Sequence, residues 1–418
     1  MKVKVLGAGL EVGRSGFLVN ADGANYLLDY GVNLGKNLAT PLHVMPREVD
    51  TIVISHAHLD HSGYVPLMYV SGNADVFATP PTFDLSRLLI EDMLKLEKDI
   101  HPFGLPEVNK MYSHAIPVEY KQRIRRGNSS FELRDSGHVV GGSSVLVESD
   151  GKKIFYTGDV NLNGSRMLRE MDLDIGEIDL LITESTYSQT TQMPRKESEE
   201  KLIEFANEIL DQKGTLFIPS FSVERSQEIA CVLKNAKFKH KIVMDGMALS
   251  VNEIIMQYPE YLRDYDVFRD AVKNTVWIKN QAHRKRELSE PCVVISPAGM
   301  LVGGNAVFYL QELAFDKKNG IALVSYQGEG TPGRKLLETG KVMIHGREQK
   351  AEAQVRQFEF SGHSDRTALF DLVSRMKGSP KVLTVHGDGD SCTKFAEEIH
   401  QRFGLEAHAP KIGDVISV

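Results

Sequence analysis

The sequence predicts an α/β protein in which one α/β domain is interrupted by a second, inserted α/β domain. The first 60 or so residues are short apolar or alternating runs separated by glycines, which is typical of strands. From about Tyr187, helical patterns alternate with short apolar runs, which indicates a parallel sheet with crossover helices. Near Ala351 the strand-rich pattern returns. A chain of 418 residues is too long for one typical core, which agrees with two domains.

The N-terminal part begins with four predicted strands, "KVKVLGAG", "SGFLVNAD", "NYLLDYG" and "VDTIVISH". A helix is expected from Gly63 to Val70, then a strand "ADVFAT" and a helix from Pro80 to Glu97. The stretch "SSFELRDSGHVVGGSSVLVESDGKKIFYTGD" predicts three strands joined by glycine-containing turns, and "IDLLITEST" predicts a further buried strand. Apolar side chains on one face support the long helix: Leu85, Leu88, Leu89, Met93 and Leu96.

The inserted part begins with "RKESEEKLIEFANEILDQKGTLFIPSFSVERSQEIACVLKN", which predicts helix, strand and helix. "HKIVMDG", "PCVVISPAG" and "GIALVSYQG" predict further strands. After the strand-like "AQVRQFEFSGHSD" we expect a helix from Arg366 to Met376, a strand "KVLTVHGD" and a helix from Cys392 to Phe403. The predicted domains are therefore 1–185, 186–350 and 351–418, the first and last forming one unit.

Composition narrows the class of protein. With 49 Lys and Arg against 56 Asp and Glu, the net charge is −7, so a polyanion would have to be held by local groups. Cys231, Cys292 and Cys392 are widely spaced with no CxxC, which argues against disulfides and thiolate zinc sites and favours a reducing compartment. The start "MKVKVLGAGLEVG" has no long apolar region, and no apolar run reaches the ~20 residues of a membrane span. We therefore expect a cytoplasmic protein.

The segment "SHAHLDHSG" predicts a metal site, because three histidines and an aspartate fall within six residues. Neutral imidazole and carboxylate are good zinc ligands. His56 and His58 are two residues apart on an extended segment, so their side chains share a face and can reach one ion. Asp60 and His61, past the turn, can reach a second ion.

Further ligands must come from elsewhere, and three polar residues beside glycines are the candidates. These are His138 in "DSGHVVGG", Asp159 in "FYTGDVN" and His386 in "LTVHGDGD". Asp159 and His386 directly follow apolar runs, whereas His138 precedes one. Most other histidines, His345 among them, show no such pattern and are expected to be ordinary surface or core residues.

These residues carry a resemblance to a known family. HxHxDH, a distant histidine, the aspartate of "TGD" and a final histidine resemble the metallo-β-lactamase fold hydrolases. Glu184 in "TEST", His363 in "FSGHSD" and His386 in "VHGD" resemble the three motifs of the β-CASP nucleases, and "SPAGMLVGG" and "YQGEGTPGRKL" resemble their inserted cap. The resemblance covers essentially the whole chain. It is closest to the nuclease subunit of the polyadenylation cleavage factor and its archaeal relatives, and more distant to ribonuclease J. It implies a metallo-β-lactamase αββα sandwich with an inserted β-CASP α/β domain.

The resemblance also implies a site with two Zn²⁺ ions. One ion would be held by His56, His58 and His138, the other by Asp60, His61 and His386, with Asp159 bridging them. The implied catalytic residues are His363, Glu184 and Asp60, with His363 protonating the leaving oxygen, a role worth roughly 10²–10⁴-fold. Glu184 would orient His363 and favour its charged form. Without the resemblance, the sequence favours a plain strand-end carboxylate for Glu184 and a turn histidine for His363.

Two further groups of residues are assigned by the same resemblance. Asp29 in "LLDYG" would hydrogen-bond to a ligand histidine or to the HxHxDH turn, and a plain turn aspartate is the equal alternative. Backbone amides near glycines can cradle a phosphate. The residues that would contact a substrate phosphate in this way are Ser296, Gly299, Ser361 and Gly362.

The expected function is that of a zinc-dependent ribonuclease acting on single-stranded RNA in RNA processing, such as mRNA 3′-end processing, or in decay. In the family a histidine at the last motif, here His386, goes with RNA substrates. Endonuclease and 5′→3′ exonuclease activities stay open, as does a homodimer. The alternatives are a small-molecule hydrolase of the lactamase fold and a non-catalytic RNA-processing scaffold. Because strands begin directly at Met1 and nothing follows Val418, we expect neither the KH modules of some archaeal members nor a C-terminal extension.

Overall fold

The computed structural model describes residues 1–34, 38–344 and 346–418, so His345 lies outside the described residues. The chain divides into two compact units. Unit 1 contains Met1–Gly164, Arg169–Thr191 and His363–Val418, and unit 2 contains Ser165–Leu168 and Gln192–Gly362. An inserted unit within a discontinuous one is the arrangement that the sequence predicts.

Unit 1 is built on two seven-stranded sheets. In order across the first sheet, the strands are β24 (Val415–Ser417), β1 (Lys2–Val5), β2 (Gly16–Ala21), β3 (Ala24–Tyr30), β6 (Thr51–Val53), β7 (Asp75–Ala78) and β8 (Ala115–Pro117). Across the second sheet they are β23 (Ala407–His408), β22 (Lys381–Val385), β13 (Leu180–Glu184), β12 (Lys152–Tyr156), β11 (Ser143–Ser149), β10 (Ser129–Asp135) and β9 (Ile124–Arg126). A small pair, β4 (Asn33–Leu34) and β5 (Leu38–Ala39), lies apart from both sheets.

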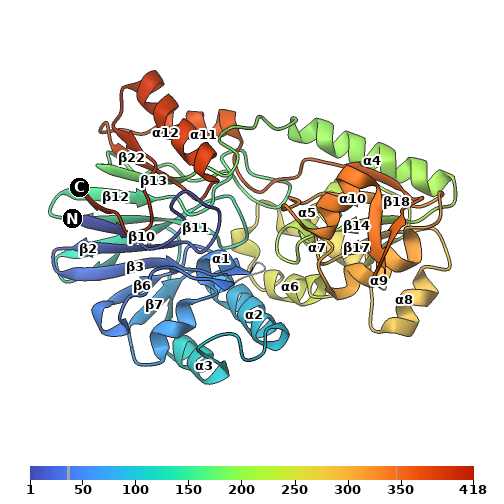
Figure 1. Ribbon diagram of the computed structural model, residues 1–418, viewed down its shortest axis with the longest axis horizontal. Helices are drawn as coiled ribbons and strands as arrows, with labels where there is room; N and C mark the ends of the chain where they lie inside the picture. Colours follow the sequence, from blue (N-terminus) through green and yellow to red (C-terminus); the bar gives the residue numbers. More distant parts are fainter. Residues whose placement is uncertain (35–37, 345) are drawn as a thin grey trace. The chain divides into compact units, whose positions relative to one another are not determined.

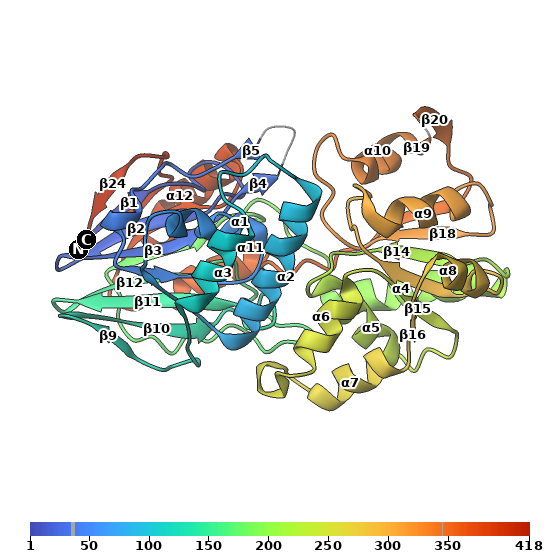
Figure 2. The same ribbon diagram turned by 90° about the horizontal axis from the view of Figure 1, so that it is seen from below.

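Helices cover the outer face of each sheet of unit 1 (Figures 1 and 2). Against the first sheet lie η1 (Pro46–Glu48), α1 (Leu59–Ser62), η2 (Val65–Tyr69), α2 (Pro80–Leu96) and α3 (Leu105–Ser113). Against the second lie α11 (Arg366–Ser374) and α12 (Gly389–Phe403). A third apolar layer, with Phe17, Tyr26, Phe131 and Tyr156, fills the space between the sheets. This αββα sandwich confirms the fold expected from the sequence.

Local sequence accounts for the main helices and for one difference from expectation. Helix α2 begins where the Thr79 side chain accepts a hydrogen bond from the Thr82 amide, and α12 ends at Gly404 in the left-handed region. The helix expected from Gly63 to Val70 is instead the 3₁₀ segment η2, in which Pro66 lies near the start. Segment η2 spans only Val65–Tyr69, and 3₁₀ helices are common in such short connections between longer elements.

Unit 2 is built on a six-stranded sheet in which every pairing is parallel. Its order is β16 (Val276–Trp277), β15 (Ile242–Met244), β17 (Val293–Ser296), β14 (Leu216–Pro219), β18 (Gly320–Leu323) and β21 (Gln354–Gln357). A hairpin of β19 (Lys341–Ile344) and β20 (Arg347–Lys350) is attached. Strand β21 comes from the strand-like stretch after Ala351 and pairs with β18.

Crossover helices connect the strands of unit 2, as the alternating pattern predicts. They are α4 (Arg195–Asp211), α5 (Arg225–Asn235), α6 (Ala248–Ile255), η3 (Pro259–Tyr261), α7 (Tyr265–Lys273), α8 (Gln281–Glu287), α9 (Gly304–Leu313) and α10 (Pro332–Thr339). A core cluster with Phe217, Val294 and Leu310 joins the sheet to these helices. Across both units, none of the helices within the described ranges is long and apolar enough to cross a membrane.

Candidate metal centre

The candidate ligands of unit 1 follow the carboxyl ends of its strands. His56 and His58 follow β6, and Asp60 and His61 lie in the short α1. In the second sheet β12, β13 and β22 run parallel, so their carboxyl ends meet at one edge. Asp159 follows β12, Glu184 ends β13 and His386 follows β22, while His138 lies in the loop after β10. The topology therefore brings residues far apart in sequence to one place.

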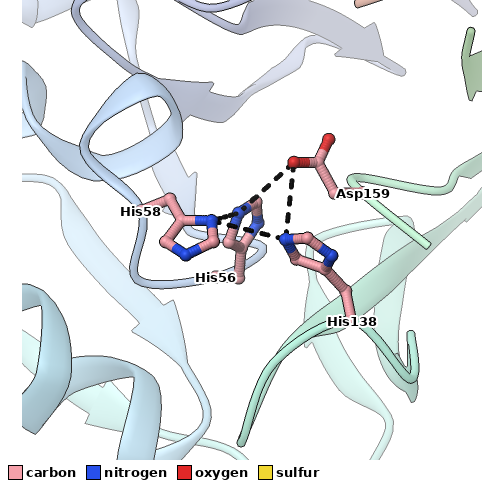
Figure 3. Close-up of side chains that lie close together, drawn as sticks. All are labelled: His56, His58, His138 and Asp159. Carbon is pink, nitrogen blue, oxygen red and sulfur yellow. Dashed lines mark hydrogen bonds and ion pairs between the residues drawn. The ribbon is translucent and has the colours of Figure 1, made fainter. Parts of the chain in front are cut away.

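The first group of donor atoms surrounds a single point (Figure 3). The Nδ1 atom of His58 lies 3.1 Å from Nε2 of His56 and 3.3 Å from Nε2 of His138. Oδ2 of Asp159 lies 3.6 Å from Nε2 of His56 and 3.7 Å from Nε2 of His138. Donors bound at ~2.0–2.1 Å around one tetrahedral ion lie about 3.3 Å apart, so this spacing fits a metal ion.

The second group uses the other oxygen of Asp159. Oδ1 of Asp159 lies 3.4 Å from Nε2 of His61 and 3.4 Å from Nδ1 of His386. Oδ2 of Asp60 lies 3.2 Å from Nε2 of His386 and 3.9 Å from Nε2 of His61. Asp60, His61 and His386 each offer one ligand atom within 4.8 Å of the others. Asp159 therefore faces one group with each carboxylate oxygen.

An unpartnered atom marks the centre of this arrangement. Asp159 is 2% exposed, and its Oδ1 has no hydrogen-bond partner among the described residues. A buried carboxylate oxygen without a partner is costly unless a cation satisfies it. The donor set of neutral imidazoles and carboxylates is also one that zinc prefers. The described residues therefore contain a site that fits a metal ion.

Protonation differs between the two groups of donors. Burial lowers the pKa of His56, aided by the charge of His61, and burial also lowers the pKa of His58. These imidazoles are therefore neutral, which is the form that binds a metal. In the second group burial opposes protonation, but the carboxylates of Asp159 and Asp60 outweigh it and raise the pKa of His61 and His386, so a metal ion bound there has to displace a proton. Burial opposes ionisation of Asp159, but the surrounding histidines, His386 first, hold its pKa well below the usual range.

A histidine–carboxylate pair lies beside the two groups. Nδ1 of His363 lies 2.9 Å from both carboxylate oxygens of Glu184, which is fully buried. Its Nε2 lies 3.9 Å from Oδ2 of Asp159. Burial opposes protonation of His363, but the Glu184 and Asp159 carboxylates outweigh it and raise its pKa to about 9. Glu184 is also fixed through its Oε1, which accepts a hydrogen bond from the Val160 amide at 2.8 Å.

The buried Asp29 carboxylate contacts the segment that carries His56, His58, Asp60 and His61. Its carboxylate accepts hydrogen bonds from the amide and the hydroxyl of Ser55, both at 2.6 Å, and lies 2.8 Å from Nδ1 of His61. The hydroxyl of Tyr156 donates a further bond at 2.7 Å. Asp29 thus has the contacts that the sequence resemblance implies. Ser55 and Tyr156 were not identified from the sequence. The one sequence feature that could have indicated them is their position at the end of an apolar strand: Ser55 directly precedes His56, and Tyr156 lies three residues before Asp159.

The four residues expected to contact a substrate phosphate all belong to unit 2. Ser296 is fully buried, and its hydroxyl donates to the Pro297 carbonyl at 3.2 Å. A side chain on Gly299 would meet the Ser325 hydroxyl at 2.9 Å and the Phe221 amide at 3.1 Å, which explains the glycine by close packing. The Ser361 carbonyl accepts a bond from Arg195, and Gly362 ends the unit. Their contact with phosphate remains a prediction.

Three family models match consecutive parts of the chain. A metallo-β-lactamase superfamily domain matches residues 18–194, and a Beta-Casp domain matches residues 226–336. A Zn-dependent metallo-hydrolase RNA specificity domain matches residues 348–410. The order of these matches confirms the resemblance seen in the sequence motifs.

Several relatives match over the full length of the chain. The chain is 35% identical to RNase aCSPSF2 of Saccharolobus solfataricus, over 100% of this chain and 85% of that protein. It is 34% identical to the probable RNase MJ4 of Methanocaldococcus jannaschii, over 100% of both. It is 32% identical to the transcription termination factor FttA of Thermococcus kodakarensis, over 100% of this chain and 71% of that protein.

A solved structure supports the fold independently of sequence. The crystal structure of a protein of unknown function from Enterococcus faecalis matches with a TM-score of 0.64 at 14% identity, over 99% of both chains. At that identity the likeness shows the fold alone. Together with the family models and the relatives, it leads to one conclusion: the chain belongs to the metallo-β-lactamase superfamily, in the branch that carries an inserted Beta-Casp domain.

Proposed function

We propose that the chain is a zinc-dependent ribonuclease that hydrolyses phosphodiester bonds of single-stranded RNA. The observation that carries the proposal is the pair of donor groups sharing Asp159, with the His363–Glu184 pair beside them. The relatives named as RNases and the match to an RNA specificity domain support RNA as the substrate.

We assign two Zn²⁺ ions to the site. His56, His58 and His138 would hold one ion, Asp60, His61 and His386 the other, and Asp159 would contact both. Zinc bound there would supply Lewis acidity and lower the pKa of water toward neutrality. The buried Asp29 carboxylate would orient the His61 ring through its contact with Nδ1. Asp29 is itself held in place by hydrogen bonds from Ser55 and Tyr156.

His363 has the position of a general acid in this proposal. Glu184 holds Nδ1 of His363, which leaves Nε2 on the side of Asp159. A proton on Nε2 is therefore available to the oxygen that leaves when the phosphodiester bond breaks. Glu184 acts through His363 and is a positioning residue, whereas Asp60 stays a candidate for both ligand and catalytic roles. The net charge of −7 fits a protein that holds RNA by such local groups.

Cleavage of a body-labelled RNA blocked at its 5′ end tests the proposal and separates its two forms. Internal cuts that need zinc indicate an endonuclease. Complete resistance of the blocked RNA, with digestion of the same RNA bearing a free 5′ end, indicates a 5′-dependent exonuclease.

Two outcomes would contradict the proposal in favour of the alternatives. Hydrolysis of a thioester or lactone with no effect on either RNA would indicate a small-molecule hydrolase. Tight RNA binding by the zinc-loaded chain without any product would indicate a non-catalytic scaffold.

A further inference from the structure

Unit 2 contains a cavity that the proposed chemistry does not use. It has a volume of about 500 Å³ and lies between α4 and the segment that continues the edge strand β21. Its lining residues are Met193, Ser198, Lys201, Glu204, Arg356, Gln357, Phe358 and Glu359. All of them belong to unit 2, and a volume of this size is in the ordinary range for small-molecule sites, ~300–1,000 Å³.

A fixed, flat guanidinium forms one wall of the cavity. The Cζ atom of Arg356 lies 4.2 Å from the centroid of the Phe205 ring, and the Phe358 ring lies 5.8 Å from Phe205. The guanidinium is also held by Glu208, whose two oxygens lie 2.9 Å and 2.8 Å from its Nη2. Since the Arg356 side chain is still 44% exposed, part of its surface remains open to a ligand.

The other wall offers a hydroxyl without a partner. Ser198 is 1% exposed, lines the cavity, and its Oγ has no hydrogen-bond partner among the described residues. Ser198, Lys201 and Phe205 are three and four residues apart on α4, so they share the face of the helix that meets β21. A buried hydroxyl of this kind is satisfied when a polar ligand or a water enters.

The charges of the cavity favour a neutral ligand over an anion. The Nζ atom of Lys201 lies 2.9 Å from Glu197, and Arg356 is paired with Glu208, so both cations are already balanced. Glu204 and Glu359 add negative charge to the lining. A free phosphate would therefore meet more carboxylates than unpaired cations, whereas a flat, neutral, polar ring meets a stacking surface and hydrogen-bonding groups.

From these observations, we propose that the cavity holds an unpaired nucleobase of the RNA substrate, stacked on Arg356 and hydrogen-bonded to Ser198. The proposal rests on the function proposed above, because it takes RNA as the ligand. Guanidinium planes are common stacking surfaces for the exposed bases of single-stranded RNA. The cavity would thus bind one base of the strand independently of the metal centre.

Equilibrium binding of a labelled single-stranded RNA tests this site in a His363→Ala background that keeps the RNA intact. Arg356→Ala is expected to weaken RNA binding by about 5- to 100-fold, the effect typical of losing one base stack. Arg356→Lys keeps the charge but loses the flat surface, so it should weaken binding as much. Ser198→Ala should weaken binding by about 2- to 10-fold with an unchanged melting temperature, because its hydroxyl has no protein partner to lose.

Salt dependence separates a base contact from a phosphate contact. Stacking on Arg356 predicts that Arg356→Ala leaves the slope of log K against log salt unchanged, whereas loss of a phosphate contact lowers it by about 0.7. The matched control is Arg334→Ala, which removes an exposed arginine that is likewise paired with a glutamate, Glu338. This control should bind RNA like the parent.

Specific results would overturn the proposal. Parental affinity in Arg356→Lys together with a reduced salt slope in Arg356→Ala would indicate a phosphate contact. Parental affinity in both Arg356 variants would show that no base occupies the cavity. Failure of the unaltered, zinc-loaded chain to cleave RNA would count against the proposed function instead, so the two failures are distinguishable.

Discussion

Two buried carboxylates, one in each unit, are ionised to very different degrees. Asp159 of unit 1 is 2% exposed, yet histidines on several sides hold its pKa well below the usual range. Glu224 of unit 2 is 4% exposed, and burial together with the nearby Glu228 raises its pKa to about 8. Arg225 and Arg195 oppose this rise only in part. Burial is therefore the same in both places, and the neighbouring charges decide the ionisation state.

The two carboxylates differ in role. Asp159 belongs to a site that suits a bound cation, whereas the burial of Glu224 only lowers the stability of the fold. Oδ1 of Asp159 has no hydrogen-bond partner among the described residues and faces imidazole nitrogens of His61 and His386 at 3.4 Å, an arrangement that suits a cation. Glu224 also has an unpartnered oxygen within the described part of the chain, and its backbone has a φ of 72°, a value that favours glycine. No imidazole or second cluster of donors surrounds it among the described groups. An unpartnered buried carboxylate thus indicates a metal site only when its neighbours are metal ligands.

The largest effect is expected from Asp159→Asn, which removes the charge that both donor groups share. The variant should lose zinc, from two ions per chain to one or none, and RNA cleavage should fall below detection. Elemental analysis of the purified chain measures the zinc content, and circular dichroism checks the fold. Full zinc content in the folded variant would show that the Asp159 charge is not needed to hold either ion.

His363→Ala should reduce RNA cleavage by about 10²–10⁴-fold while zinc content stays at the parental level, because the general acid is lost and the ligands are kept. Initial rates on a defined RNA measure the loss. His408→Ala is a matched control, since it breaks an exposed histidine–glutamate pair in which Nε2 of His408 lies 2.9 Å from Oε1 of Glu406. Parental cleavage by His363→Ala would make the general-acid assignment wrong.

Tyr156→Phe tests the support beneath the histidines. The ring keeps its contact with Phe17, 5.0 Å between centroids, but Asp29 loses one hydrogen-bond donor. Zinc affinity, measured by competition with a chelator, should weaken by about 10- to 100-fold, as for other residues that orient metal ligands. Tyr26→Phe lies between the same sheets and loses a bond to Ser129 instead, so it should bind zinc normally. Equal affinities in both variants would contradict the role of Tyr156.

Glu224→Gln should have the smallest functional effect: zinc binding and RNA cleavage should be unchanged, and only stability should change, at pH values above about 4.5. The folded chain binds the Glu224 proton more tightly than the unfolded chain, whose pKa is 4.5. Stability therefore falls as pH rises from 4.5 to about 8, and the loss persists above that range. The amide cannot ionise, so the variant should be more stable than the parent at pH 9, on the order of a few kcal/mol, and equal to it near pH 4.

Chemical unfolding at the two pH values measures this difference. Glu312→Gln, an exposed glutamate of α9, is the control and should show no such pH dependence. If Glu224→Gln and the parent were equally stable at pH 9, the contrast between the two carboxylates would disappear.

The sequence predicted the parts of this molecule that rest on local pattern. HxHxDH, the glycine turns and the strand ends were enough to name residues that the fold brings within a few ångströms, and the αββα layers with an inserted parallel sheet follow from the order of strand and helix patterns. The family resemblance supplied what pattern alone did not, since Glu184 and His363 would otherwise have read as ordinary residues.

Features that depend on contacts between distant segments could not be predicted. Tyr156 donates to Asp29 only because two sheets stack, and nothing in "KKIFY" indicates that partner. Ser198 meets Arg356 in one cavity because α4 lies beside β21, which follows it by more than a hundred residues. The strand-like stretch after Ala351 was predicted with the C-terminal part, whereas β21 pairs with β18 in the sheet of unit 2, because pairing partners are not encoded in the strand pattern itself.

Titration of the metal-free chain with zinc, followed by cleavage of a single-stranded RNA, measures whether hydrolysis depends on two bound ions. If the two donor groups around Asp159 form the hydrolytic centre, RNA cleavage should be absent without zinc and should rise to a plateau at two equivalents per chain. Full cleavage by the metal-free chain, or a zinc-loaded chain that leaves RNA intact, would contradict a zinc-dependent hydrolytic centre at Asp159.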